Sequence, residues 1–382
     1  MNLAKKLLAV MMNQISSGLW NETSVVMQHI LDAANAYHTL EGSATRSTLG
    51  ATLTGTFKWN GAVLAPNGKI YCVPLNSTDI LIIDPIANTS ARSNMGASLN
   101  DTVKFSGGVL APNGKIYCIP ANATDILIID PVAGTATRSN MGASLTGTSK
   151  FTGAVLAPNG KIYCVPNSSA DILIIDPVAG KATRSNMGAT LTTDSSKWSG
   201  AVLAPNGKIY CVPYNSTDIL IIDPVANTAT RSTLGATLTG TFKWNGAVLA
   251  PNGKIYCVPY NSTDILIIDP VANTATRSNI GVTLSGSGEF NCGVLAPNGK
   301  IYCVPYVSTN ILIIDPVANT ATRSALGATL SDSSKFTGGV LASNGKIYGV
   351  PSSSADILII DKNGSVPALD IKDCLSPHLN KF

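Results

Sequence analysis

The sequence predicts an all-β protein, a seven-bladed β-propeller whose ring is closed by strands from both ends of the repeat array. Three observations lead to this fold. One unit of 46 or 47 residues recurs along the chain, each unit has room for four short strands, and the array begins and ends with incomplete units. A fixed period in this range is typical of architectures in which every unit packs on its neighbours.

The glycine of a P-N-G or S-N-G turn marks the period. It recurs at steps of 46 or 47 residues, at Gly68, Gly114, Gly160, Gly207, Gly253, Gly299 and Gly345. The one longer step contains an additional residue in the stretch 192–196. Seven units therefore follow one another without a linker between them.

Each unit reads as four strands, which we call A to D. In one unit we expect strand A at 244–250, strand B at 254–259, strand C at 264–269 and strand D at 274–278. Proline and glycine in the P-N-G turn suit a tight reversal between strands A and B. Polar residues separate strands B and C, and P-V-A-N separates strands C and D.

Strand C reads D-I-L-I-I-D and is apolar at every internal position. A strand with one face in water alternates apolar and polar residues, so this run indicates a sheet that is covered on both faces. No helical pattern lies inside the repeat, so the sheets must cover one another. Small four-stranded sheets that stack in this way describe a β-propeller. A straight β-solenoid is the alternative, although its coils are shorter and its ends need caps.

The two ends of the array favour the closed ring. Residues 43–50 match a strand D with its exit, as at 228–235, but they precede the first strand A. The last unit stops after its strand C at 356–361. The lone first strand can complete the last sheet only if the two ends meet, which is the closure known as velcro.

The P-N-G-K turn, the apolar strand that ends in aspartate and the 46-residue period resemble the WD40 and YVTN-type β-propeller repeats. The resemblance covers residues 43–361 and implies a propeller. The sequence has Ile-Asp where WD40 repeats have Trp-Asp, and it lacks their Gly-His dipeptide.

Three regions are expected: a helical extension at 1–42, the propeller at 43–371 and a tail at 372–382. The extension has a basic start and a short apolar run, which favours an amphipathic helix over a secretory signal. A second helix after Asn21 has an apolar side that packs on the propeller or docks a partner or a second copy. No apolar stretch reaches the ~18 residues of a transmembrane helix, and a net charge of +4 does not indicate a nucleic-acid partner.

Cysteine usage bears on the compartment. Six cysteines occupy one position of strand B: Cys72, Cys118, Cys164, Cys211, Cys257 and Cys303. Facing sheets lie about 10 Å apart, too far for a disulfide, so we expect free, buried thiols in a reducing, intracellular setting. Five N-x-S/T triplets in the B–C turns, at Asn76, Asn122, Asn167, Asn215 and Asn261, keep a secreted glycoprotein as the alternative.

The array offers little catalytic chemistry. The three histidines, His29, His38 and His378, all lie outside it, and Asn-Gly-Lys is a hairpin turn rather than part of a phosphate-binding loop. The aspartates that open and close strand C recur in nearly every unit, which favours structural roles. We therefore expect no catalytic residue, no metal site and no cofactor, and hence no enzyme.

One repeated position suggests a binding site. A charged residue directly before strand A is expected to line the mouth of the ring, where the D–A and B–C loops share a face. The residues are Lys58, Lys104, Lys150, Lys197, Lys243, Glu289 and Lys335, and the B–C loops add Tyr214, Tyr260 and Tyr306. Six lysines on one exposed rim would focus a positive potential, so the expected partner is an acidic protein surface or an anionic glycan.

The function that we expect is a non-enzymatic binding scaffold for protein–protein interaction or assembly through this loop face. The alternative is a multivalent lectin, because near-identical blades form near-identical crevices that gain from avidity. A propeller-type hydrolase or lyase is the third reading, against which the missing histidines count. The B–C tips differ between units, which favours the scaffold over the lectin.

Overall fold

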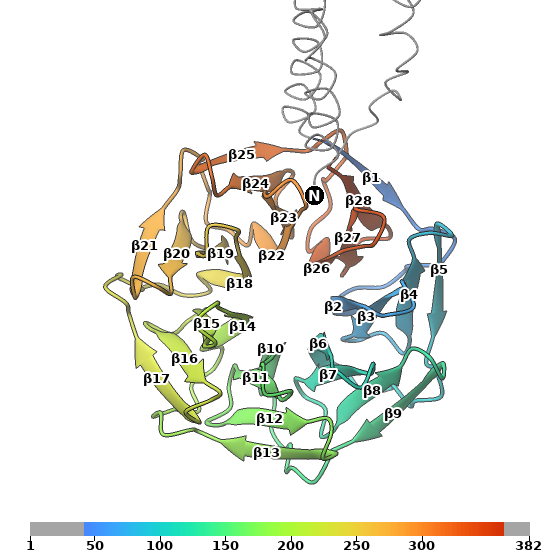
Figure 1. The fold of residues 1–382 in the computed structure, drawn as a ribbon. Helices are drawn as coiled ribbons and strands as arrows, with labels where there is room; N and C mark the ends of the chain where they lie inside the picture. The colour runs from blue at the N-terminus through green and yellow to red at the C-terminus, as the bar shows by residue number, and fades with distance from the viewer. Residues whose placement is uncertain (1–41, 363–382) are drawn as a thin grey trace, which may run out of the picture. The chain divides into compact units, whose positions relative to one another are not determined.

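The computed structural model describes residues 42–362, which form 28 strands in seven four-stranded antiparallel sheets. The sheets, or blades, surround a central axis as a closed propeller (Figure 1). The predicted all-β, seven-bladed propeller is confirmed. The helical extension at 1–42 and the tail at 372–382 fall almost wholly outside the described residues, and the propeller strands run from Ser43 to Asp361.

Each blade takes one strand from each of four sets, from the axis outward. The A strands are β2 (Trp59–Leu64), β6 (Phe105–Leu110), β10 (Phe151–Leu156), β14 (Trp198–Leu203), β18 (Trp244–Leu249), β22 (Phe290–Leu295) and β26 (Phe336–Leu341). The B strands are β3 (Ile70–Pro74), β7 (Ile116–Pro120), β11 (Ile162–Pro166), β15 (Ile209–Pro213), β19 (Ile255–Pro259), β23 (Ile301–Pro305) and β27 (Ile347–Pro351).

The two outer sets complete the blades. The C strands are β4 (Ile80–Asp84), β8 (Ile126–Asp130), β12 (Ile172–Asp176), β16 (Ile219–Asp223), β20 (Ile265–Asp269), β24 (Ile311–Asp315) and β28 (Ile357–Asp361). The D strands are β5 (Thr89–Ser93), β9 (Thr135–Ser139), β13 (Lys181–Ser185), β17 (Thr228–Ser232), β21 (Thr274–Ser278), β25 (Thr320–Ser324) and β1 (Ser43–Ser47). Blades 1 to 6 are consecutive in sequence, and blade 7 has the order β1-β28-β27-β26.

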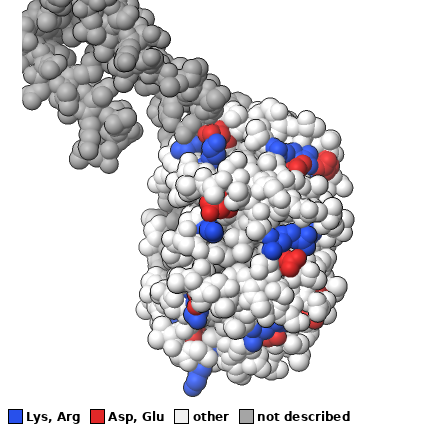
Figure 2. All heavy atoms as spheres, turned by 90° about the vertical axis from the view of Figure 1, so that its right-hand side faces the viewer, with Lys and Arg blue, Asp and Glu red and all other residues white. Residues whose placement is uncertain are grey.

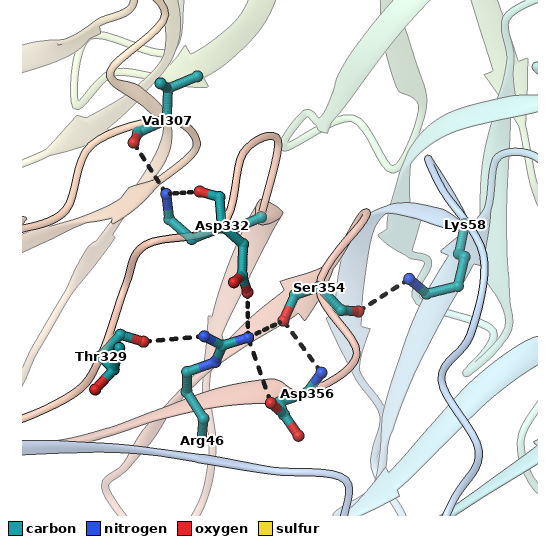
Figure 3. Close-up of polar contacts among 8 residues, drawn as sticks. Arg46, Lys58, Val307, Thr329, Asp332, Ser354 and Asp356 are labelled. Atoms are coloured by element: carbon teal, nitrogen blue, oxygen red, sulfur yellow. Dashed lines mark hydrogen bonds and ion pairs between the residues drawn. The ribbon is translucent and has the colours of Figure 1, made fainter.

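Blade 7 therefore joins the first described strand to the last, as the incomplete end units predict, and the β-solenoid is excluded. Arg46 of β1 holds the closure. Its guanidinium donates to the carbonyl of Thr329 and to the hydroxyl of Ser354, and it forms ion pairs with Asp332 and Asp356 (Figure 3). One side chain thus ties β1 to two loops, at residues 329–332 and 354–356, that lie about 300 residues away in sequence.

The turns repeat because their side chains hold the backbone. In the A–B turn of blade 1, the Asn67 side chain accepts a hydrogen bond from the Lys69 amide and donates to the hydroxyl of Tyr71. In the C–D turn, one oxygen of Asp84 accepts from the amides of Ile86 and Ala87. The predicted capping role of the aspartate that closes strand C is confirmed, and its Ala87 bond lowers the pKa of that carboxyl.

The hydrophobic core consists of seven clusters, each lying between adjacent blades. Between blades 1 and 2, Phe105 contacts a cluster that includes Val73 from one blade and Cys118 from the other. The six strand-B cysteines are buried and unpaired, as expected, and burial raises the pKa of each thiol. The aromatic residues that open the A strands are likewise fully buried, so they fill space between blades.

Candidate functional site

The B–C and D–A loops lie together on one face, which we call the mouth surface. Each B–C loop is bonded to the D–A loops on both sides. In blade 1, the Leu75 amide donates to the carbonyl of Lys58, and the Leu75 carbonyl accepts from the amide of Lys104 in the next blade. The mouth surface is therefore a continuous ring of loops held by main-chain bonds. Its B–C tips are Leu75, Ala121, Asn167, Tyr214, Tyr260, Tyr306 and Ser352.

The six predicted lysines lie in these loops, but they do not form an exposed rim. Their exposed fractions are between 0 and 3%. The ammonium group of Lys58 donates to the carbonyls of Gly55, Ser352 and Ser354, at 2.8, 2.8 and 2.9 Å. Lys104, Lys150, Lys197, Lys243 and Lys335 make related bonds to loop carbonyls. The expectation of an exposed positive rim is wrong, because converging carbonyls draw each side chain into the loops.

Five of the six lysines bond through their ammonium groups to a carbonyl of the blade before them, and Lys104 does so through its main-chain amide. Ser352 and Ser354 belong to blade 7, whereas Lys58 leads into blade 1. Figure 3 shows the bond from Lys58 to Ser354. Burial and the nearby Arg92 lower the pKa of Lys58 to about 8. The carbonyl oxygens act in the opposite direction, since they stabilise the charged form. The lysines thus hold neighbouring blades together and offer no charge to a partner.

Blade 6 has a negatively charged residue at the position where the other blades have lysine. Glu289 stands where the other blades have lysine, and Asn310 stands where they have the aspartate that opens strand C. In the other blades that aspartate pairs with the strand-D arginine, as Asp264 does with Arg277 at 2.9 Å. In blade 6 the arginine, Arg323, pairs with Glu289 at 2.8 Å instead. Compared with the other blades, blade 6 therefore has its negative charge before strand A instead of at the start of strand C. The strand-D arginine can reach both positions.

The three predicted tyrosines come together as a row across blades 4, 5 and 6. The ring centroids of Tyr214 and Tyr260 lie 5.7 Å apart, and those of Tyr260 and Tyr306 lie 5.6 Å apart. Phe242, from the D–A loop of blade 5, extends the row at 5.0 Å from Tyr214. All three tyrosines are half-buried, and burial raises the pKa of Tyr214 and Tyr260, so the row is neutral. We call these four residues the tyrosine row.

One further apolar side chain adjoins the tyrosine row on the same face. Val307 follows Tyr306 and is 43% exposed, and Phe242 within the row is 40% exposed. Gly288, at the D–A position next to Tyr260, has no side chain, and a Cβ there would lie 3.5 Å from the tyrosine ring. At the corresponding B–C tips, blades 2, 3 and 7 have alanine, asparagine and serine. The mouth surface is therefore asymmetric: its three tyrosines are gathered on three adjacent blades, while Phe57, 42% exposed, stands in the D–A loop before blade 1.

The asparagines of the N-x-S/T triplets form hydrogen bonds that hold the loops of the mouth surface together. The side-chain oxygen of Asn76 accepts from the Val103 amide at 2.7 Å, and Asn122, Asn215 and Asn261 make the matching bond in their blades. Asn167 is buried and donates to the carbonyl of Trp198. These contacts account for the repeated asparagines as structural residues.

Sequence reasoning named the tyrosines but missed Phe242, Gly288 and Val307. They could have been found by looking for positions where one unit differs from the others and where the side chain makes no contact that holds the loop. Within residues 42–362, no group of three or more His, Cys, Asp or Glu side chains is placed to hold a metal ion. In the same range no helix is long and apolar enough to cross a membrane.

Comparisons with known proteins show what this fold is similar to. A catalytically inactive histidine-to-alanine variant of virginiamycin B lyase from Staphylococcus aureus, with quinupristin, superposes with a TM-score of 0.67 at 15% identity. The match covers 84% of this chain and 99% of the lyase. Hydrazine synthase from Kuenenia stuttgartiensis matches with a TM-score of 0.60 at 13% identity, over 82% of this chain and 98% of that one.

The extracellular domain of a hybrid two component system from B. thetaiotaomicron also matches. Its TM-score is 0.64 at 12% identity, over 85% of this chain and 43% of that one. No model of a protein family and no curated protein sequence matches the chain. The class is therefore a seven-bladed β-propeller, and the resemblance to WD40 and YVTN-type repeats is not confirmed beyond the fold.

Two expectations change with these comparisons. The exclusion of an enzyme, argued from the missing histidines and the recurring aspartates, was wrong, because virginiamycin B lyase, an enzyme, is among the proteins with this fold. The expectation of an intracellular protein has no support among the matches. Extracellular propeller domains are present among them, which is consistent with the secreted alternative.

Proposed function

We propose that the mouth surface binds a partner protein and that the chain acts as a scaffold through it. The observation that carries this proposal is the tyrosine row. Tyrosine and other aromatic residues are enriched in protein interfaces, where they contribute a large apolar area together with a hydroxyl group. The row is half-exposed, neutral and restricted to blades 4 to 6, so it favours one partner in one orientation.

The chemistry of the surface also indicates the kind of partner. Because the lysines are buried, the earlier reason for an acidic partner is gone. A neutral, aromatic surface fits an apolar segment that buries side chains against the rings and bonds to the phenol hydroxyls. No observation supports the multivalent lectin, since the crevices at the B–C tips differ from blade to blade.

The repeat supplies substitutions that the fold already tolerates. Ala121 of blade 2 and Ser352 of blade 7 occupy the tip position, so Tyr260→Ala and Tyr306→Ser copy residues found at equivalent sites. We expect the double variant to keep its melting temperature and to lose the proteins that the wild-type chain captures from its source, as quantified by mass spectrometry. Leu75→Ala, on the far side of the mouth surface, is the control and should capture the same proteins. Unchanged capture by the tyrosine variant would refute the proposal.

A further inference from the structure

The opposite face of the propeller, formed by the A–B and C–D turns, carries a ring of exposed aliphatic side chains. In blades 1 to 6 a β-branched residue follows the proline of the C–D turn. Between 73 and 86% of each such residue is exposed, and we call the set the aliphatic ring: Ile86, Val132, Val178, Val225, Val271 and Val317. Because these positions are equivalent in equivalent blades, they lie on one circle about the axis of the propeller.

The fold does not use these side chains. In blade 2 the C–D turn is held by Asp130, whose carboxylate accepts from the amides of Val132 and Ala133 at 3.1 and 2.9 Å. The valine contributes its amide to this turn, which any residue other than proline would provide. With 86% of its surface exposed, Val132 gains almost nothing from burial. An aliphatic side chain at this place has no role in the isolated chain.

The exposed C–D position varies little between blades. It is valine in five blades and isoleucine in one, and the exposed alanine that follows it is equally constant, whereas the B–C tips include leucine, alanine, asparagine, tyrosine and serine. Repetition of this kind leaves one exposed apolar side chain on the same face of six blades, where another molecule can cover them together.

Most charges on this face are paired, and the exposed Lys181 at the start of β13 adds one positive charge. Every blade has one ion pair between the lysine of its A–B turn and the aspartate that ends strand C, with N–O distances of 3.1 to 3.6 Å. On the side of the propeller shown in Figure 2, positive and negative side chains likewise adjoin one another within a mostly uncharged surface. The turn face thus presents seven pairs of opposite charges and no net charge from these pairs.

We propose that this face binds a second copy of the chain, aliphatic ring against aliphatic ring, in a two-fold symmetric dimer. The six side chains of the aliphatic ring can all be covered at once by a flat, uniformly apolar surface or by a partner whose apolar groups have the same spacing around an axis. A second copy of the chain has that spacing. In a two-fold interface the same patch faces itself, so each Lys–Asp pair meets a region that carries both signs.

The alternative uniform surface, a membrane, fits less well. Proteins that lie on membranes insert aromatic or leucine side chains and carry an excess of basic residues. The aliphatic ring has only valine and isoleucine, and each lysine of the A–B turns is paired with an aspartate. The turn face is also large enough for a dimer. An interface of standard size takes about 20 to 30 residues from each partner, and six C–D turns with seven A–B turns supply more than that.

The test uses the full chain and the triple substitution Val132→Asp, Val225→Asp and Val317→Asp. These side chains are exposed, so the variant should fold with the circular dichroism spectrum of the wild type. Light scattering during size-exclusion chromatography should give twice the chain mass of 39.5 kDa for the wild type and the single chain mass for the triple variant. The control Val103→Asp with Val307→Asp changes exposed valines of the mouth surface and should remain dimeric.

Three results would overturn the proposal. They are a wild-type chain that stays monomeric at every concentration reached, a triple variant that remains dimeric, and a monomeric wild type that sediments with phosphatidylcholine–phosphatidylserine vesicles when the triple variant does not. The last result would assign the ring to a membrane. Partner capture by the mouth surface is measured separately, so failure of either proposal leaves the other open to its own test.

Discussion

The two faces of the propeller differ in how their loops are held. On the turn face, side chains hold the backbone: Asn67 bonds the A–B turn and Asp84 bonds the C–D turn. The same residues therefore recur in every blade. On the mouth surface, lysine and asparagine side chains fasten the loops, but each tip residue is held through its main chain, as by the bond from the Leu75 amide to the Lys58 carbonyl, and the tip residues vary. The B–C tip residues can thus vary because their main-chain atoms, and not their side chains, bond to the neighbouring loops. We propose partner binding at these tips.

Both faces depend on ring closure, so the largest effect is expected when closure is lost. A chain lacking residues 1–48 has no β1 and no Arg46, which leaves the edge of β28 unpaired. We expect a loss of roughly 4 kcal/mol or more in the free energy of unfolding, in line with removal of a packed strand. The control lacks residues 1–41 and keeps β1. Equal denaturant midpoints for the two truncations would contradict the closure described here.

Two lysines of blade 1 allow a direct comparison of the faces. Lys58 is buried at the mouth surface, while the side chain of Lys69 on the turn face is 44% exposed beside Asp84. Lys58→Met leaves buried carbonyls without a donor, which should cost about 2 to 4 kcal/mol. Lys69→Met removes an exposed ion pair and should cost less than ~1 kcal/mol. Chemical denaturation measures both values, and similar losses would mean that the carbonyl cage does not stabilise the fold.

Blade 6 provides a charge-swap test of the mouth surface. Glu289→Lys removes the carboxylate that pairs with Arg323 and introduces a second buried cation. We expect a loss of about 1 to 3 kcal/mol. Adding Asn310→Asp recreates the arrangement of the other blades and should restore most of that loss, so the double-mutant cycle should show coupling of about 1 kcal/mol or more. Additive effects would show that the two positions are independent.

The buried lysine should also make stability depend on pH. The pKa of Lys58 is lowered to about 8 in the folded chain, whereas an unfolded lysine titrates near 10.4. Between these values the unfolded state binds more protons, so the stability contributed by Lys58 rises with pH. The stability difference between the wild type and Lys58→Met should therefore be constant below about pH 8 and grow toward pH 10. A difference that shrinks across this range would contradict the sign.

Much of the fold was accessible from the sequence because its determinants are local and repeated. The turn glycines give the period, D-I-L-I-I-D indicates a sheet covered on both faces, and the unpaired strand at 43–50 indicates closure. These patterns need no knowledge of which residues meet in space. The corrections to the propeller itself are shifts of one residue at strand ends: in blade 5, strand A ends at Leu249, strand B begins at Ile255 and strand C begins at Ile265.

The candidate site was less accessible because it depends on contacts between blades. A lysine before an aromatic residue specifies a loop position, but nothing in the order of residues shows that carbonyls of the preceding blade converge on its ammonium group, as Ser352 and Ser354 do on Lys58. The paired departures Glu289 and Asn310 were visible in the sequence. The structure shows why the two departures occur together: Arg323 lies within reach of both positions and pairs with Glu289.

The closing strand has a consequence for how the chain folds. Its sequence, S-A-T-R-S, differs from the T-A-T-R-S of β17 and β21 at one residue, so residue identity alone does not select the partner of β28. The other D strands are tethered to their own blades by short turns, which close quickly. The strand β1 must return across about 300 residues, a late and non-local step. In concentrated refolding mixtures the β1 strand of another molecule competes for the same edge, and strand-exchanged chains become the expected side product.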